Sequence, residues 1–98
     1  MTFEEFQRSL KDDTPPASLN PILEGLWYDG KEDWEAAHNI AQSAEGTPAY
    51  DRLHAYLHRK EGDTWNANYW YRRAGAATYT GSLLSEWETL VRQYLERS

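Results

Sequence analysis

Helix start signals recur at short intervals along this chain, and they limit it to a set of short helices. Asn20 and Thr47 each precede a proline, and a capping residue followed by proline is typical of the first turn of a helix. Thr2 and Glu5 have the spacing of a capping box, and Asp63 precedes a further helical segment. Apolar residues between these signals follow helical spacing, and no segment shows the alternation typical of a strand. The pattern therefore predicts an all-α protein.

Glycines indicate where the predicted helices end and how they are grouped. We expect one domain, residues 1–98, with six short helices. It comprises an N-terminal helix at 2–12, two antiparallel helical hairpins at about 20–44 and 48–74, and a C-terminal helix at 82–97. The predicted helix ends in the middle of the chain lie at Gly30, Gly46, Gly62 and Gly75. An irregular helical bundle is the alternative to the hairpin arrangement.

The two predicted hairpins repeat one another with an offset of 30 residues, as Ala37 and Ala67 show. The other matching positions are Gly25 and Ala55, Tyr28 and His58, Ala41 and Tyr71, and Ala44 and Ala74. These offsets resemble the tetratricopeptide repeat, although the period is about four residues shorter than the usual 34. The resemblance implies stacked helical hairpins that bind other proteins. The runs HAYLHRKEGD and NANYWYRRAG are also similar to a short uncharacterised family of bacterial proteins, which implies no particular chemistry.

The charge of the chain is unevenly distributed, which bears on the partners that it can bind. Residues 1–49 carry ten acidic and three basic side chains, and residues 50–98 carry six and seven. The acidic first half argues against nucleic-acid binding, whereas the second half leaves room for an acidic peptide or an anionic small molecule. The chain has no Cys, which excludes disulfides and thiolate metal sites. Because no apolar run reaches the roughly 20 residues of a membrane span and no signal-peptide pattern is present, we expect a cytoplasmic protein without membrane contact.

The run WNANYWYRRAG at residues 65–75 is the densest group of aromatic and basic residues. Helical geometry places one set of its residues on a core face: Ala67, Trp70, Tyr71 and Ala74. The opposite face carries the candidate binding residues Trp65, Tyr69, Arg72 and Arg73. In one interpretation the C-terminal helix covers this second face. In the other it is a solvent-facing groove for a carboxylate or phosphate beside an apolar body, and Arg73 is a surface cation with little effect on folding.

Two histidines one helical turn apart, His54 and His58, are the candidate metal ligands. Asp51 and Glu61 extend the same stripe of the helix. We interpret this stripe as a polar face exposed to solvent. We expect no stable metal ion and no cofactor, because two imidazoles on an exposed helix lack a third strong ligand.

The third histidine, His38, lies on the apolar face of its own helix beside Trp34 and Ala41. A lone histidine in this position is typically a core residue that is hydrogen-bonded to a backbone carbonyl or a carboxylate. It also remains a candidate for ligand binding.

The sequence lacks the motifs of the common catalytic sites, including the nucleophile elbow, the phosphate-binding loop and the dinucleotide fingerprint. It favours a non-catalytic interaction or scaffold module that binds a protein, a peptide or a second copy of itself through the aromatic and arginine surface. The alternative is a binding protein for an anionic small molecule, or an enzyme, that uses His38, His54 or His58 with Arg72 and Arg73. An enclosed polar pocket would favour this alternative, and a broad groove would favour the interaction module.

Overall fold

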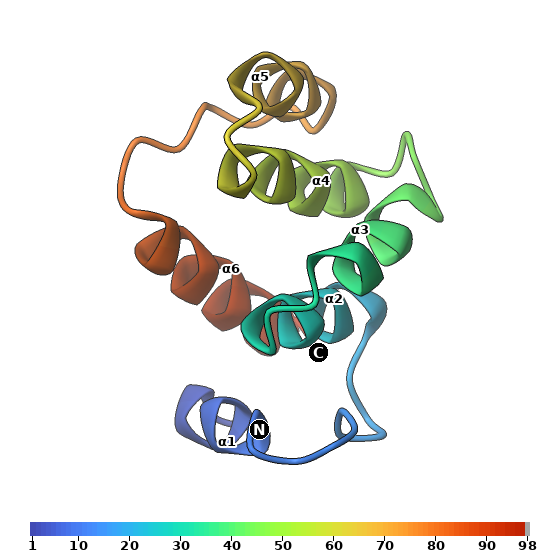
Figure 1. The fold of residues 1–98 in the computed structure, drawn as a ribbon, viewed down its shortest axis with the longest axis vertical. Coiled ribbons are helices and arrows are strands. Elements are labelled where there is room, and N and C mark those ends of the chain that lie inside the picture. The colour runs from blue at the N-terminus through green and yellow to red at the C-terminus, as the bar shows by residue number, and fades with distance from the viewer. Residues whose placement is uncertain (98) are drawn as a thin grey trace.

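The computed structural model describes residues 1–97 and confirms the all-α fold. Within these residues it contains six helices and no strand. The helices are α1 (Phe3–Ser9), α2 (Pro21–Gly30), α3 (Trp34–Gln42), α4 (Pro48–Lys60), α5 (Thr64–Arg73) and α6 (Leu83–Arg97) (Figure 1). No helix of this part of the chain is both long and apolar enough to cross a lipid bilayer.

Most of the predicted capping residues act as expected. The Thr2 hydroxyl accepts a hydrogen bond from the Glu5 amide, and the Glu5 carboxylate accepts one from the Thr2 amide. The side chains of Asn20 and Asp63 accept hydrogen bonds from amides three residues further on, at the starts of α2 and α5. Thr47 differs because its side chain makes no capping hydrogen bond. The following proline, with its fixed φ, is therefore the main start signal of α4.

The glycine signals hold at three of the four predicted positions. Positive φ angles are found at Gly46, Gly62 and Gly75. After α2, by contrast, Glu32 adopts the left-handed conformation with a φ of 62°. Gly30 has a different role, because a Cβ there would lie 3.0 Å from Leu10 Cδ2 and 3.2 Å from Trp87 Cζ2. The feature that favours a small residue at this position is the close packing of neighbouring side chains and not the backbone conformation.

Helices that follow one another in the sequence pack against each other from α2 to α5. α2 packs on α3, α3 on α4 and α4 on α5, and α2 also contacts α4 (Figure 1). Residues 31–33 join α2 to α3, and residues 61–63 join α4 to α5. The middle of the chain thus forms two consecutive pairs of helices, each pair joined by a short turn.

Small residues set the distance between some of these helices. A Cβ on Gly25 of α2 would lie 2.7 Å from Leu53 Cδ2 of α4, so these two helices approach closely at that point. At the position that the predicted repeat pairs with Gly25, Ala55 is fully buried in a cluster that joins α4 to α5.

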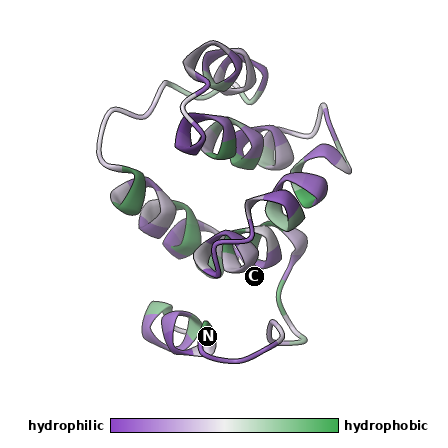
Figure 2. Ribbon diagram, in the orientation of Figure 1, coloured by the Kyte–Doolittle hydropathy of each residue, from purple (hydrophilic) through white to green (hydrophobic). Residues whose placement is uncertain are grey.

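α6 does not lie where one of the two interpretations placed it. It packs on α1, α2 and α4, and residues 74–82 lead it away from the outer face of α5 (Figure 1). The larger hydrophobic core therefore lies among α1, α2, α3, α4 and α6. Figure 2 shows α5 mainly in hydrophilic and neutral colours, because its large side chains are Trp and Tyr.

Candidate functional site

α5 has an inner face that packs on α4 and an outer face without a covering helix. The inner face is buried, as predicted, at Ala67, Trp70 and Tyr71, whereas Ala74, which was predicted there too, lies just after α5 and is only half-buried. The outer face carries the four candidate binding residues Trp65, Tyr69, Arg72 and Arg73, which we call the α5 surface. The interpretation in which the C-terminal helix covers these residues is wrong, since α6 packs elsewhere.

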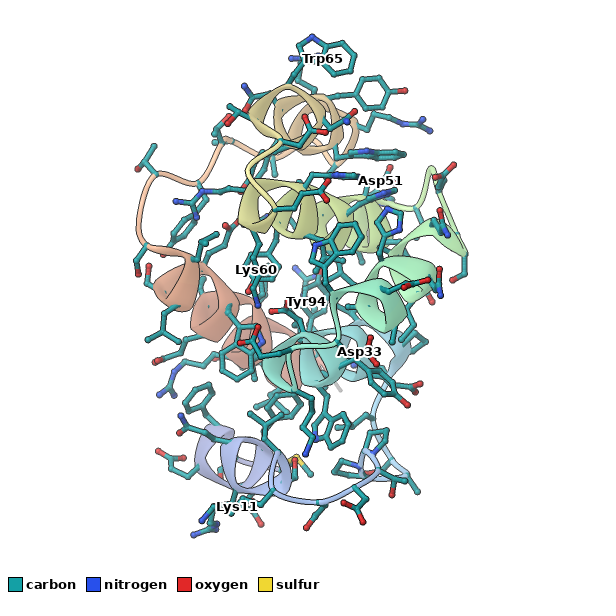
Figure 3. All side chains as sticks on the ribbon, in the orientation of Figure 1. Lys11, Asp33, Asp51, Lys60, Trp65 and Tyr94 are labelled. Carbon is teal, nitrogen blue, oxygen red and sulfur yellow. The ribbon has the colours of Figure 1, made fainter. Side chains whose placement is uncertain are left out.

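The α5 surface is a ridge that projects from one end of the molecule. Trp65 is 72% exposed, and its indole points away from the rest of the protein (Figure 3). The indole stacks nearly parallel to the ring of Tyr69, with 6.2 Å between ring centroids and an interplanar angle of 14°. Arg72 is exposed and forms no ion pair within residues 1–97. What the structure shows at these four residues is a projecting surface, and none of them lines the hollows formed by Gly30 and Trp87, by Phe3 and Arg92, or by Arg52 and Tyr94.

Arg73 is tied to the protein more firmly than expected of a free surface cation. Its Nη1 donates a hydrogen bond of 3.2 Å to the Tyr69 hydroxyl, and its guanidinium lies over the Trp70 ring. Its Nε is 3.9 Å from Oδ2 of Asp51, a carboxylate oxygen that is buried and accepts no hydrogen bond. The expectation that Arg73 is a surface cation with little effect on folding did not include this contact with a buried carboxylate, and its effect on stability stays a prediction.

Three histidines converge between α3, α4 and α5. Nε2 of His54 lies 3.0 Å from Nε2 of His38, and one ligand nitrogen from each of these residues and His58 lies within 4.8 Å of the others. We call these three residues the histidine cluster. Both reasons for expecting no metal at His54 and His58 are wrong. His54 is only 2% exposed, with Asp51 buried beside it on the same helix, and His38 supplies a third imidazole.

Two tryptophans hold the imidazole rings of the cluster in place. Trp34 stacks on His38, with 4.6 Å between centroids and an angle of 10°, and its Nε1 donates a hydrogen bond to the Leu57 carbonyl. Trp70 stacks on His54 from the opposite side, at 3.9 Å and 17°. The predicted position of His38 beside Trp34 is confirmed. Its hydrogen-bond partner is the imidazole of His54 and not the predicted carbonyl or carboxylate.

The cluster disfavours protonated imidazoles. Burial is the main cause that lowers the pKa of His54 to about 4, and the nearby charges of His38, His58 and Arg73 contribute the rest of this shift. Burial also lowers the pKa of His38, and His58 adds to this effect. Nδ1 of His58 lies 2.7 Å from Oε1 of Glu61, which orients that ring. The imidazoles of His38 and His54 are therefore neutral at neutral pH and can offer lone pairs to a ligand.

Two buried acids were missed by sequence reasoning. Glu86 of α6 is fully buried, and its carboxylate pairs with Arg52 and Arg59 of α4 at 2.8 Å each. It also accepts a hydrogen bond of 2.5 Å from the hydroxyl of Tyr71 of α5. Asp29 of α2 is also buried, and it was missed in the same way. A signal was available for Glu86, because it lies three residues after Leu83 and four before Leu90, within the apolar stripe of its helix.

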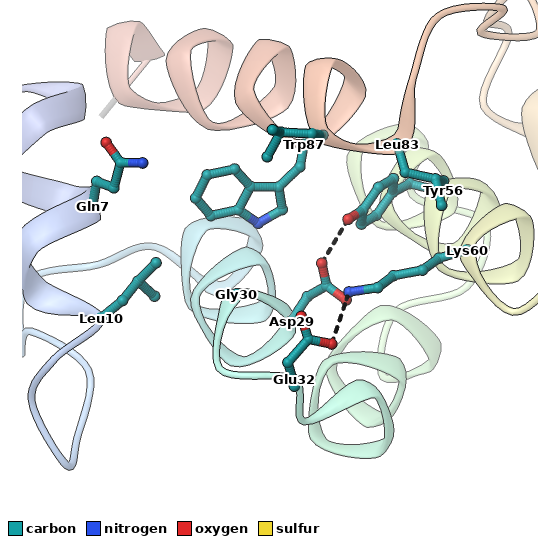
Figure 4. A pocket seen from close by; sticks show the side chains of 10 residues that line it. Gln7, Leu10, Asp29, Gly30, Glu32, Tyr56, Lys60, Leu83 and Trp87 are labelled. Carbon is teal, nitrogen blue, oxygen red and sulfur yellow. Dashed lines mark hydrogen bonds and ion pairs between the residues drawn. The ribbon is translucent and has the colours of Figure 1, made fainter.

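Asp29 forms the polar end of a hollow between α1, α2, α4 and α6, with a volume of about 330 Å³ (Figure 4). Its carboxylate accepts a hydrogen bond of 2.6 Å from the Tyr56 hydroxyl and pairs with Lys60 Nζ at 2.9 Å. Lys60 also lies 3.5 Å from Glu32. The apolar side of the hollow is lined by Leu10, Leu83, Leu84 and Trp87. The charged groups in this hollow thus compensate one another, and no His or Arg lines it.

Comparisons with known proteins give no match to this chain, whether with family models, curated proteins or solved structures.

Proposed function

We propose that this chain is a non-catalytic protein-interaction module whose α5 surface binds an acidic peptide segment of a partner protein. The exposure of Trp65 carries the proposal. A large aromatic side chain in solvent is costly to a free protein, whereas Trp, Tyr and Arg are the residues most enriched at the energetic centres of interfaces. Trp65 and Tyr69 already stack, so little side-chain entropy would be lost on binding.

The charges around the α5 surface support an acidic partner. Arg72 has no partner carboxylate within the described residues, and its guanidinium can form two parallel hydrogen bonds with an incoming carboxylate. The first half of the chain is strongly acidic and repels such a partner elsewhere. Because the surface is a ridge, the partner supplies the concave side, with an apolar pocket for the indole and carboxylates beside it.

The scaffold that displays this ridge is, in our proposal, a pair of tetratricopeptide-like hairpins. The offset of 30 residues between the hairpins supports it, as do the close contacts at Gly25 and Ala55. In such a stack the last hairpin has no following repeat to cover it. That position accounts for the free outer face of α5.

A small-molecule binding protein or an enzyme has less support. The hollow of Figure 4 contains none of the histidines or arginines that the alternative requires, and its carboxylate is already paired with Tyr56 and Lys60. The histidines converge elsewhere, behind α5, at a site where the described residues place no paired nucleophile and base.

Capture from a native cell lysate, followed by affinity measurement with the purified partner, tests the proposal. Trp65→Ala and Arg72→Ala should each weaken binding at least about tenfold. Leu84→Ala is the matched control, because Leu84 is also 72% exposed but lies on α6. Equal weakening by Trp65→Ala and Leu84→Ala would contradict the assignment. If the partner is instead a second copy of this chain, sedimentation velocity should show a dimer, and Trp65→Ala should dissociate it.

A further inference from the structure

We propose that His38, His54 and His58 form a binding site for one divalent transition-metal ion of the zinc class. The site consists of other residues than the α5 surface and does not depend on the function proposed for that surface, although Trp70 contacts both His54 and Arg73. It rests on three imidazoles that two helices bring together, with one ligand nitrogen of each within 4.8 Å of the others.

The spacing of the nitrogens suits a metal ion. Zn–N bonds of about 2.0–2.1 Å in a tetrahedral site place two ligand nitrogens about 3.3 Å apart. Nε2 of His38 and Nε2 of His54 are 3.0 Å apart, so a shift of a few tenths of an ångström would admit the ion between them. The ring of His58 stacks 4.8 Å from that of His54, with an angle of 21°. Because an imidazole binds an ion in the plane of its own ring, coordination by all three residues requires His58 to turn out of this stacked arrangement.

The surroundings have the features of a site prepared for an ion. Glu61 holds Nδ1 of His58 at 2.7 Å, which leaves Nε2 of that ring for coordination. Carboxylates that orient ligand imidazoles in this way are the usual supporting partners at zinc sites. The Trp34 and Trp70 rings fix the planes of His38 and His54. His38 and His58 are both partly exposed, which provides a path for the ion to enter.

Without an ion, the cluster compensates the burial of its polar atoms poorly. The imidazoles of His38 and His54 share a single hydrogen bond between their Nε2 atoms. Buried polar groups normally have partners, and three clustered histidines with so few bonds need an explanation. A bound cation would use the lone pairs directly. Imidazole ligands suit Zn²⁺, Cu²⁺ and Ni²⁺ and not Mg²⁺ or Ca²⁺. Three such ligands leave one coordination position for water or a group from outside.

A second group of possible ligands lies nearby and has to be distinguished in the test. His58, Glu61 and Asp63 also have ligand atoms within 4.8 Å of one another, at the turn between α4 and α5. That group excludes His38, whereas the proposed site requires it. Asp63→Asn removes a carboxylate of the second group and keeps a good helix cap. His38→Phe removes an imidazole of the proposed site and keeps a flat ring to stack on Trp34.

The experiment is calorimetric titration of the chelator-treated full chain with ZnCl₂, repeated with MgCl₂, together with visible absorption after Co²⁺ addition. We expect one Zn²⁺ per chain, no Mg²⁺ binding and the intense absorption of tetrahedral Co²⁺. His38→Phe should weaken Zn²⁺ binding more than about 100-fold, and Asp63→Asn less than about threefold, with circular dichroism confirming that both variants are folded. His54→Gln, which keeps a polar side chain at the position, should match His38→Phe. Binding that survives His38→Phe but is lost in Asp63→Asn would overturn the proposal, as would the absence of stoichiometric Zn²⁺ binding to the unmodified chain.

Discussion

At the scale of single residues, the polar side chains that matter most are the buried ones. Glu86 is enclosed by Arg52 and Arg59 of α4 and by the hydroxyl of Tyr71 of α5. This carboxylate links three helices, and it joins α5 to α6 although the two helices do not pack on one another. A buried charge is tolerated only when it is paired in this manner, and loss of one member leaves the others unpaired.

Glu86→Ala should therefore destabilise the protein by about 3–5 kcal/mol, because two guanidinium groups and a hydroxyl lose their partner. Glu88→Ala is the control. Glu88 lies on the same helix and pairs with Arg92 at 2.9 Å, but both side chains of that pair are exposed. Such a surface pair contributes at most about 1 kcal/mol. Urea denaturation of the two variants provides the comparison, and similar midpoints would contradict the structural role of Glu86.

Patterns in the sequence predicted the apolar core better than the buried polar residues. Trp70 and Tyr71 could be placed inside because their spacing follows the alanines of the same helix. His54 and Asp51 could not, since a polar stripe on one helix is the same in the sequence whether water or a neighbouring helix covers it. α4 contacts α2, α3, α5 and α6, so it has almost no solvent face. The number of neighbours around a helix is a property of the fold that the periodicity of one segment does not contain.

At the scale of elements, α5 is held by one face only. Its buried residues Ala67, Trp70 and Tyr71 contact α4, and the opposite side is open. Two tryptophans of the same helix therefore have opposite roles: Trp70 is 8% exposed and packs on His54, whereas Trp65 is 72% exposed. The two side chains are chemically identical and differ in how far they are buried, so they can be compared directly.

Trp70→Ala should destabilise the protein by about 3–5 kcal/mol, because it empties a large volume between α4 and α5. Trp65→Ala should change stability by less than about 0.5 kcal/mol, as is usual for surface substitutions. Thermal unfolding followed by circular dichroism measures both. If the melting temperatures of the two variants fell together, the division of α5 into an inner and an outer face would be wrong.

Helix starts were more predictable than helix ends, because the caps are local: the N-terminal helix predicted at 2–12 ends at Ser9, and Gly30 is not the left-handed residue after α2. The capping box at Thr2 and the caps at Asn20 and Asp63 act as their spacing predicts. The destination of α6 was not predictable in this way. Its apolar stripe shows that one face is buried, but residues 74–82 are long enough to deliver the helix either onto α5 or across to α2. Only the summed packing of Trp87, Leu90 and Val91 in the larger core decides between them.

At the scale of the whole molecule, α4 is the central element, and the histidine cluster lies where it meets α3 and α5. His38 faces His54 from α3, His58 from the same helix and Arg73 from α5. Burial is the largest cause of the lowered pKa of His54, and the charges of these three residues add to it. Protonation of His54 would therefore place a positive charge among other cationic or ionisable groups at a junction of three helices. The stability of the whole fold should respond to this single group.

The free energy of unfolding of the metal-free protein should decrease as the pH falls from about 6.5 to 4. The pKa of His54 is about 4 in the folded chain and has its ordinary value of 6.5 in the unfolded chain, so the unfolded chain binds the extra proton over this interval. The contribution of neutral His54 is complete above pH 6.5 and is lost as the pH falls towards 4. A shift of this size corresponds to at most about 3 kcal/mol, and water around the partly exposed His38 and His58 screens part of it, so we expect a loss of about 1–2 kcal/mol.

Urea unfolding at pH 7, 6 and 5 in the presence of a chelator measures how steeply the free energy of unfolding depends on pH, above the range in which most carboxylates titrate. His54→Gln should make that slope shallower, and an unchanged slope in this variant would show that His54 does not control the acid sensitivity of the fold.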